Sequence, residues 1–264
     1  MSILVVEVLP QGLIFGADRN ITVTSTTLEV NGRVEVTVIQ GQGQRPKVLK
    51  WPNNRALIGY VGAAQIAGIP MDEWLYEFIG RHFDFTSFED LAKILGGEVE
   101  QWRSIDEGNN PAEPLVVHLG GFEEQQGHQV PVVWHLRNAS ASSGYEDASK
   151  VFQLSEAFWE YFPDTPPAQI RLQLDELAKN YDPFWFHQGI DLWTFNDLER
   201  FLKGAVRLLC ETHPDYKPPQ TLADWEKHLK MSILTYGAWF QAFKEPGEQF
   251  VGGGVDTVKL NWPE

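Results

Sequence analysis

The first third of the chain alternates short apolar runs with turn residues, which is the pattern of antiparallel strands. Glycine, proline and asparagine separate the runs, and each run is shorter than a typical helix. The pattern predicts strands over residues 5–8, 13–17, 23–30, 34–40, 48–51 and 56–61. Asn31-Gly32 lies between the third and fourth runs and is a strong signal for a two-residue turn, so we expect a hairpin there.

Much of the remaining chain carries apolar residues three and four positions apart, which is the spacing of a buried helix face. Pro70 followed by acidic residues predicts the start of one helix, and Ser87 is expected to cap the next. Further helices are predicted from Ser155 onward and over residues 167–180, 196–212 and 222–243. The other expected segments are loops over 104–114 and 138–149, strands over 115–121 and 130–136, and a closing strand ending at Leu260.

This order of elements, strands followed by helices and then a final strand, predicts an α+β layered fold. The helix over residues 196–212 is expected to bury an apolar stripe, with Cys210 packed on the same face. The members of that stripe are Leu198, Phe201, Leu202, Ala205, Leu208 and Leu209. For Trp185 and Trp193 a hydrophobic core or a subunit contact is favoured over a ligand groove.

Length and composition exclude several classes of protein. The 264 residues suffice for one large domain or two small ones, and a hydrophobic content of 43% argues against disorder. No run reaches the roughly 20 apolar residues of a membrane span, and the first residues lack the basic segment of a signal peptide, so no membrane partner is expected. The single Cys210 excludes an internal disulfide framework and favours a reducing, cytoplasmic location. A net charge of −15 repels phosphate backbones, so no nucleic-acid partner is expected.

The histidines and glycines give little sign of a metal or nucleotide site. No histidine pair has the spacing of a common metal motif, and no metal ligand is assigned. His118 and His135 lie in neighbouring predicted strands, and we expect a structural pair if they face each other. The glycines at 120–121 and 252–254 lack the strand–turn–helix context of a phosphate loop.

The beginning of the chain carries a candidate nucleophile. Removal of Met1 would leave Ser2 with a hydroxyl and a free α-amine, and an α-amine titrates near ~8. The first hairpin is expected to bring Asp18 back beside Ser2. These residues alone are more common in proteins without such chemistry, because many chains begin Met-Ser and Asp often ends a strand.

Three further motifs follow in order along the chain. Lys47 leads a short strand, and an apolar strand that ends at Gly62 comes next. Leu119-Gly120-Gly121-Phe122 lies in a central strand, and Gly252-Gly253-Gly254 opens the closing strand. Taken together, these motifs resemble the proteasome β-subunit family of the N-terminal-nucleophile hydrolases. The resemblance implies a four-layer αββα sandwich of two antiparallel sheets in a single domain over residues 1–264.

The resemblance also implies roles for individual residues. Ser2 corresponds to the nucleophile, Lys47 to a nearby cation that favours its deprotonated form, and Asp18 to the acid that holds Lys47 in place. The Gly62 N–H corresponds to the oxyanion donor. Substrate-binding positions fall on Tyr60, Ile21 and Ala64. The Tyr60 ring is expected to shorten the first specificity pocket and to favour small side chains. No metal or organic cofactor is implied.

The implied partners are a peptide or amide substrate and further copies of the chain in a ring-like homo-oligomer, with an ATP-dependent unfoldase left open. The chain departs from the family in several places. Segments near 22–40 and 182–219 are expected to be insertions. Val251 lies where the family has a supporting Ser, with Glu248 the nearby acid, and Ser155 matches a second supporting Ser only weakly. Two alternatives therefore stay open: a non-catalytic assembly or binding protein, and a small-molecule amidase or acylase.

Overall fold

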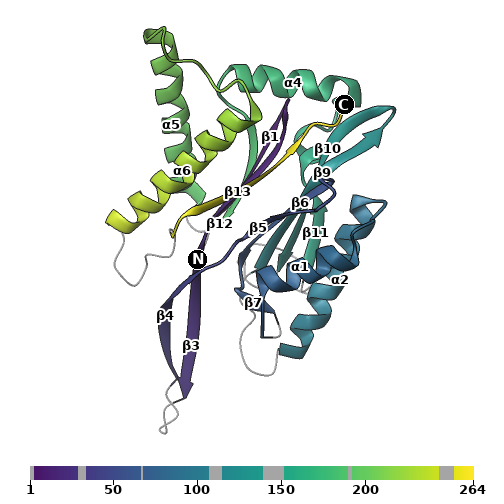
Figure 1. Ribbon diagram of the computed structural model, residues 1–264, viewed down its shortest axis with the longest axis vertical. Coiled ribbons are helices and arrows are strands. Elements are labelled where there is room, and N and C mark those ends of the chain that lie inside the picture. Colours follow the sequence, from purple (N-terminus) through teal and green to yellow (C-terminus); the bar gives the residue numbers. More distant parts are fainter. Residues whose placement is uncertain are drawn as a thin grey trace.

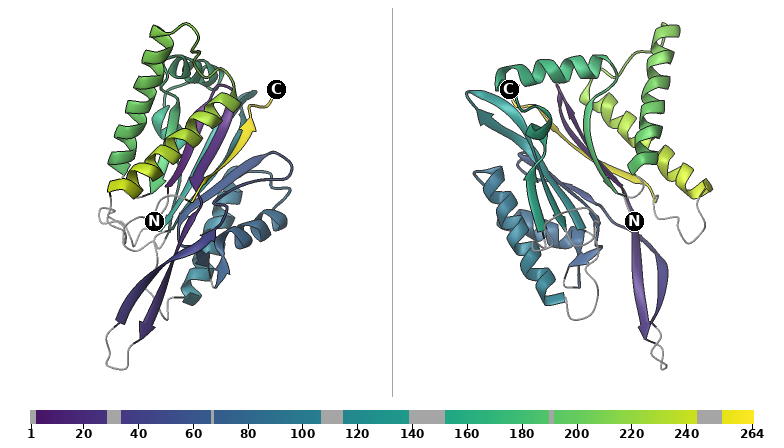
Figure 2. Two further views of the ribbon diagram at one scale, coloured as in Figure 1. Left: turned by 60° about the vertical axis from the view of Figure 1, so that its left-hand side comes forward. Right: turned by 180° about the vertical axis from the view of Figure 1, so that it is seen from behind.

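Two antiparallel sheets face each other, and helices cover both outer faces (Figures 1 and 2). The structure is a computed structural model. It describes residues 3–28, 34–66, 68–106, 115–138, 152–189, 192–243 and 253–264. The predicted α+β fold with two antiparallel sheets is confirmed.

The first sheet contains the beginning and the end of the chain. Its strand order is β12-β1-β2-β13, formed by Phe184–Gly189, Ile3–Leu9, Gly12–Asp18 and Val255–Asn261. β1 and β2 form a tight hairpin in which Leu9 pairs with Gly12. The sequence pattern did not predict β12, which lies in the expected insertion at 182–219 and pairs with β1 along its length.

The second sheet has the strand order β11-β10-β9-β6-β5. These strands are Phe152–Glu156, His128–Asn138, Leu115–Gln125, Ala56–Gly62 and Val48–Lys50. Successive strands pair antiparallel, so each is joined to its neighbour by a backbone ladder.

The predicted hairpin near residues 22–40 forms a separate two-stranded sheet. Its strands are β3 (Asn20–Leu28) and β4 (Val34–Gln44), and Figure 1 shows them projecting away from the sandwich. The expected Asn31-Gly32 turn lies outside the described residues. A second small sheet pairs β7 (Gln65–Ile66) with β8 (Ile69–Pro70) and leads into the first helix.

Strand β1 is buried on both faces, because apolar residues occupy both sets of alternating positions. Leu4, Val6 and Val8 pack in the core between the sheets. Ile3 and Val5 pack on the other side, against the outer helices. Each such side chain contributes roughly 1.5–3 kcal/mol through burial.

The outer layers consist of two helix pairs. α1 (Met71–Arg81) and α2 (Phe88–Asp106) cover the second sheet, while α5 (Leu192–Thr212) and α6 (Leu222–Phe243) cover the first. None of the helices in the described part of the chain is both long and apolar enough to cross a membrane.

Two further helices lie between β11 and β12. They are α3 (Phe158–Tyr161) and α4 (Pro167–Lys179). Ile170 and Leu174 of α4 pack into the core between the sheets, and α4 contacts strands of both sheets (Figure 1). α4 therefore closes one end of the inter-sheet core.

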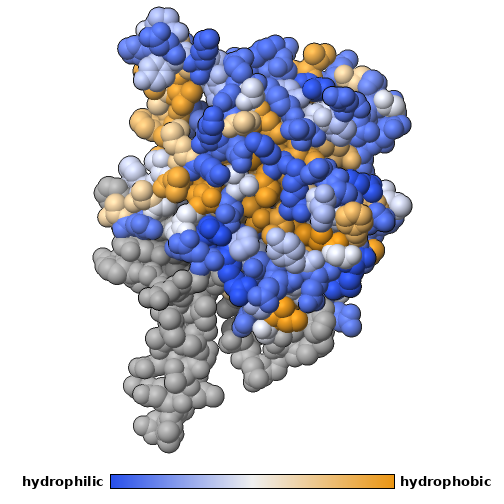
Figure 3. Space-filling model, viewed as in Figure 1, coloured by the Kyte–Doolittle hydropathy of each residue, from blue (hydrophilic) through white to orange (hydrophobic). Residues whose placement is uncertain are grey.

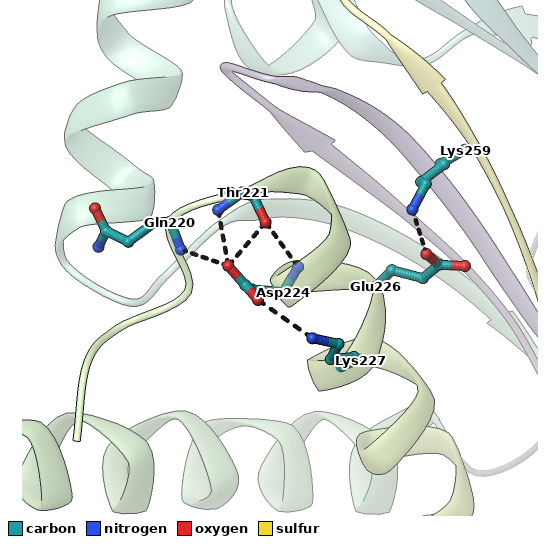
Figure 4. A network of polar contacts seen from close by, with 6 residues as sticks. All are labelled: Gln220, Thr221, Asp224, Glu226, Lys227 and Lys259. Carbon is teal, nitrogen blue, oxygen red and sulfur yellow. Dashed lines mark hydrogen bonds and ion pairs between the residues drawn. The ribbon is translucent and has the colours of Figure 1, made fainter. Parts of the chain in front are cut away.

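Helix α6 begins at a reciprocal cap and is tied to the closing strand (Figure 4). The Asp224 N–H donates to Thr221 Oγ1, and the Asp224 carboxylate accepts the Thr221 N–H, each at 3.2 Å. One turn later, Glu226 accepts a hydrogen bond from the Lys259 ammonium of β13 at 2.6 Å. These contacts fix where α6 starts and how it lies on the first sheet.

Two boundary predictions were wrong. Ser155 does not start a helix: it lies in strand β11 opposite His135, because the Phe152–Glu156 segment completes the second sheet. The helix begins later, where the Glu156 carboxylate accepts the Trp159 N–H at 2.9 Å. The predicted loop at 104–114 starts too early, since α2 continues to Asp106. Residues 107–114 and 139–150 lie outside the described residues.

The predicted apolar stripe of α5 is also wrong about burial. Phe201 is 69% exposed and Leu208 is 59% exposed, and Cys210 is only half-buried. The buried positions of the described part of α5 are Phe195, Glu199 and Lys203, four residues apart. Two of the three residues that α5 buries are therefore charged, because α5 packs on the sheet next to the buried carboxylate of Glu7.

Gly121 of β9 leaves no room for a side chain. A Cβ there would lie 2.1 Å from Phe88 Cζ and 2.7 Å from the Arg55 carbonyl oxygen. We expect Gly121→Ala to lower the free energy of unfolding by about 1–3 kcal/mol, as overpacking does in tight cores. Urea unfolding measures the change.

Gly97→Ala is the matched control. Gly97 lies inside α2, where an added Cβ meets nothing within 4 Å, so the variant should gain roughly 0.5–1 kcal/mol from helix propensity. Equal effects of the two substitutions would contradict the packing described here.

Candidate functional site

Asp18 lies at the end of β2 and is 1% exposed. Its Oδ1 accepts the backbone N–H of Ile3 at 2.8 Å and the Lys47 ammonium at 3.1 Å. Its Oδ2 accepts the Asn20 N–H at 3.3 Å. Both oxygens of this buried carboxylate are therefore hydrogen-bonded, as an ionised group in a protein interior requires.

Lys47, immediately before β5, is the buried partner of Asp18. It is 3% exposed, and its Nζ also donates to the backbone carbonyl of Asn20. Burial lowers the pKa of Lys47, and the negative charge of Asp18 opposes that lowering. The pair therefore places a cation in a nearly water-free environment, held by one carboxylate and one carbonyl.

The pair lies one residue from the candidate nucleophile. Ser2 and Met1 lie outside the described residues, but the Ile3 N–H belongs to the peptide bond that joins residues 2 and 3. The hairpin register sets this contact, because Leu4 pairs with Ala17 and Ile3 therefore comes opposite Asp18. Asp18 therefore contacts the backbone at Ile3, and its predicted approach to Ser2 stays a prediction.

Gly62 ends β6 and is exposed, with a φ of 99° that favours glycine. On the same strand, the Tyr60 N–H donates to the Lys47 carbonyl at 2.9 Å. Gly62 therefore lies two residues, or roughly 7 Å, along the strand from the backbone of Lys47. Its accessible backbone is suitable for an oxyanion donor.

The three expected substrate-binding residues differ in their surroundings. Tyr60 is buried in the core beneath α1 and α2, and burial raises the pKa of its phenol above the usual value. Ala64 is half-buried, and its carbonyl accepts the Met71 N–H at 3.0 Å at the start of α1. Ile21 lies in β3, and its side chain lies outside the described part. Tyr60 is only 1% exposed, so its part in a substrate pocket stays a prediction.

The closing glycines reach the same corner from the end of the chain. A Cβ on Gly253 would lie 2.1 Å from Asn20 Oδ1, and the Gly254 carbonyl accepts the Arg19 N–H at 3.1 Å. The Arg19 guanidinium pairs with Asp256 of β13 at 3.0 Å. Residues Glu248, Val251 and Gly252 lie outside the described residues, so the position of Val251 relative to Ser2 stays a prediction.

The sequence reasoning missed an ion-pair group beside the site. Arg45 Nη1 lies 3.0 Å from Asp72 Oδ1 and 2.7 Å from Glu73 Oε1, and Asp72 is buried. The pair joins the segment after β4 to the first turn of α1. The acidic residues after Pro70 predict only the start of a helix, and nothing in their spacing identifies Arg45 as their partner.

The predicted pairing of His118 with His135 is confirmed, and it lies outside this site. Their rings stack with centroids 4.0 Å apart, and the residues are opposite each other on β9 and β10. Burial, reinforced by the positive charge of Arg137, lowers the pKa of His135 to about 3. A neutral, stacked ring is consistent with a structural role.

One surface cavity of about 590 Å³ lies elsewhere. Its lining includes Arg55, Ser87, Phe88, Phe122 and Glu123. Arg55 directly precedes β6, whereas Gly62 ends it, so the cavity lies at the opposite end of the strand from the candidate oxyanion donor. It is not the space in which residue 2 would react.

No protein-family model and no curated protein sequence matches this chain. Solved structures that are similar to it include two Anbu proteins. An Anbu (Gly-1) mutant from Hyphomicrobium sp. strain MC1 is 15% identical, with a TM-score of 0.48 over 99% of this chain and 87% of that one. Anbu (ancestral beta-subunit) from Yersinia bercovieri is 13% identical, with a TM-score of 0.47 over 98% of this chain and 81% of that one. These values are too low to assign a family or an activity, so the geometry above is what supports any function.

Removing one member of the buried pair should be costly. We expect Lys47→Met to lower the free energy of unfolding by about 3–5 kcal/mol, because Asp18 is left as an uncompensated buried charge. The double variant Asp18→Asn/Lys47→Met should lose less than the sum of its single variants, since no bare charge remains. Urea unfolding of the three variants measures this coupling.

Lys259→Met provides the control for the loss of a lysine charge. Its ion pair with Glu226 at 2.6 Å is partly exposed, so the expected change is below about 1 kcal/mol. A Lys47→Met protein no less stable than Lys259→Met would contradict the buried pair.

Proposed function

We propose that the protein is a proteasome-like N-terminal-nucleophile hydrolase that cleaves peptide or amide bonds, with Ser2 as nucleophile after removal of Met1. The observation that carries this proposal is the buried Asp18–Lys47 pair, hydrogen-bonded to the peptide bond that follows Ser2. A buried cation next to a terminal residue favours the deprotonated forms of its hydroxyl and α-amine, which are the reactive forms.

The proposed reaction uses only groups of this chain. Ser2 Oγ attacks the carbonyl carbon, and its proton passes to the Ser2 α-amine directly or through a water. The Gly62 N–H stabilises the developing oxyanion, a donor whose loss typically costs ~10²–10³ in rate. The protonated amine then gives its proton to the leaving amine, and water hydrolyses the acyl-enzyme. Asp18 and Lys47 are positioning residues in this scheme.

A homo-oligomer is part of the proposal. Apolar side chains gather over α5 and α6 on the face shown in Figure 3, and several of them are exposed. The exposed apolar residues of α5 and α6 include Phe201, Leu208, Leu209, Met231, Leu234 and Trp239. Exposed apolar groups of this kind favour contact between copies of the chain.

A second candidate is a non-catalytic protein that keeps the fold for assembly or binding. Val251 favours it, because the related hydrolases have a Ser at the corresponding position and valine offers no hydrogen bond. Retention of Met1 would have the same consequence, since it would block the α-amine.

Mass spectrometry of the intact protein separates the two candidates. We expect loss of Met1 and one covalent adduct on Ser2 after treatment with a β-lactone electrophile. Ser2→Ala should take no adduct, whereas Ser87→Ala, at the start of α2 on the cavity at the opposite end of β6 from Gly62, should react as the wild type does. Retained Met1, or a free Ser2 that takes no adduct, would move the assignment to the non-catalytic protein.

The position of Tyr60 gives a prediction about specificity. If the Tyr60 ring forms a wall of the first pocket, a peptide library should be cleaved best after small side chains, because a bulky wall leaves little depth. The ratio of kcat/KM for alanine over leucine at that position measures the preference. Preferred cleavage after large apolar residues would show that Tyr60 does not limit the pocket.

A further inference from the structure

Glu7 is a carboxylate in the middle of an otherwise apolar strand. On β1, Ile3, Val5 and Leu9 pack toward the outer helices, and Glu7 follows the same alternation. It is 1% exposed, and Trp185 lies opposite it on the neighbouring strand. A carboxylate therefore extends from the first sheet into the helix layer, where a carboxylate is rarely found without a partner.

The two covering helices each bring a polar group to this carboxylate. Glu199 of α5 is 2% exposed, and His228 of α6 is also buried. One carboxylate oxygen each of Glu7 and Glu199 and one ring nitrogen of His228 lie within 4.8 Å of one another. His228 Nδ1 is 3.9 Å from Glu199 Oε1. Three elements far apart in the sequence therefore direct potential ligand atoms to one point.

These atoms are not satisfied by the surrounding protein. Among the described residues, Glu7 Oε2, Glu199 Oε2 and His228 Nδ1 have no hydrogen-bond partner. Leaving one such buried group unpaired costs about 1–3 kcal/mol, and more when it is charged. Three at one place indicate that something else binds there.

Lys203 supplies only part of the missing positive charge. Its Nζ is 3.7 Å from Glu199 Oε1, which is beyond a normal hydrogen bond. It also lies 4.6 Å from the centre of the Trp185 ring and 3.8 Å from Asp182, which is largely exposed. Lys203 therefore offsets one of the two buried carboxylates and leaves the other uncompensated.

We propose that Glu7, Glu199 and His228 bind one divalent metal ion of the first transition series, most readily Zn²⁺. Two carboxylates and one imidazole are ligands that Zn²⁺ and Mn²⁺ accept, and a water completes a four-coordinate shell. With Zn–N and Zn–O bonds of ~2.0–2.2 Å, tetrahedral ligand atoms lie roughly 3.4 Å apart. Side-chain adjustments on the order of 1 Å from the present positions therefore close the shell.

The ion would link the first sheet to the helices that cover it. The buried stripe of α5 is Phe195, Glu199 and Lys203, while Phe201 and Leu208 are exposed. Two of the three residues that α5 buries are therefore charged, so hydrophobic packing accounts for only part of its contact with the sheet. A metal ion bound by residues of β1, α5 and α6 together would coordinate the buried carboxylates, which are the least favourable part of that contact.

A proton is the competing solution for the same cluster. Burial, followed by the negative charge of Glu199, raises the pKa of Glu7 to about 8. A protonated Glu7 removes the repulsion between the carboxylates without any metal. The two solutions differ in metal content and in the response to added metal, and both can be measured directly.

The first experiment titrates chelator-treated protein with ZnCl₂ in a calorimeter and follows the Tm in parallel. We expect one saturable site per chain and a Tm that rises with Zn²⁺ and falls again with EDTA, because the ion binds only the folded state. MgCl₂ should bind far more weakly, since Mg²⁺ prefers oxygen ligands and retains its waters.

Two variants and one control variant test whether Glu7 and Glu199 bind the metal ion. Glu7→Gln and Glu199→Gln keep the side-chain shape but remove a ligand charge, and each should weaken Zn²⁺ binding at least about tenfold, as even outer-shell changes can. Glu226→Gln makes the same charge change on α6, where Glu226 pairs with Lys259 away from the cluster. Its Zn²⁺ affinity should equal that of the wild type.

The absorption spectrum of Co²⁺-loaded wild-type protein gives a readout that does not depend on the variants folding. Intense visible bands of a four-coordinate site would support the proposal, whereas the weak spectrum of hexahydrated Co²⁺ would count against it. Absence of saturable Zn²⁺ binding would overturn it in favour of the proton. Binding that Glu7→Gln and Glu199→Gln both retain at wild-type affinity would overturn it in favour of a surface site.

Discussion

Strand β1 is the element on which the rest of the structure depends, because it is buried on both faces. Leu4, Val6 and Val8 face the second sheet, while Ile3, Val5 and Glu7 face the outer helices. β2 and β12 pair with its two edges. A strand with no exposed face or edge cannot shift its register without exposing apolar residues, so it fixes the position of everything bonded to it.

That constraint also fixes the position of the Asp18–Lys47 pair, which the proposed nucleophile requires. The hairpin register places Asp18 beside the Ile3 N–H, and the Lys47 ammonium meets the same carboxylate oxygen. The ions are nearly inaccessible to water, where an isolated charge would be strongly disfavoured. Because Asp18 and Lys47 are paired and hydrogen-bonded, their charges are held in fixed positions next to the peptide bond that precedes Ile3. The proposed nucleophilic catalysis needs preorganised charges of this kind.

The structure contains a second buried cluster, in which the negative charges are not fully compensated by positive ones. Asp18 and Lys47 compensate each other, whereas Glu7 and Glu199 share only Lys203 at 3.7 Å from one of them. The first cluster is complete with protein groups, and the second requires a proton or a cation from solution. Glu7 lies on β1, and so does Ile3, whose N–H donates to Asp18. Binding at the second cluster would therefore also restrain a strand that contacts the first.

The sequence predicted the elements that local pattern controls. Alternation located the strands of the first third, and helical spacing located α4 and α6 within a few residues. It failed where pairing is non-local: β12 is an edge partner of β1, and Ser155 extends a strand because His135 lies opposite it. The strand or helix propensity of a few residues cannot reveal such partners, because the stabilising hydrogen bonds come from segments far along the chain.

The candidate site divides in the same way. The first hairpin was enough to bring Asp18 near Ser2, because a short hairpin limits where Asp18 can lie, whereas Lys47 and Gly62 were nominated only by the resemblance of their motifs to a known family. Burial of the pair, and therefore its electrostatic effect on residue 2, was decided only by the packing of the sheets around it. The cluster of Glu7, Glu199 and His228 could not be predicted from the sequence. Glu7 comes nearly two hundred residues before Glu199, and Glu199 and His228 lie on different helices. The sequence by itself determined which faces are apolar, and tertiary structure decided which charges meet inside, because burial is a property of the assembled layers.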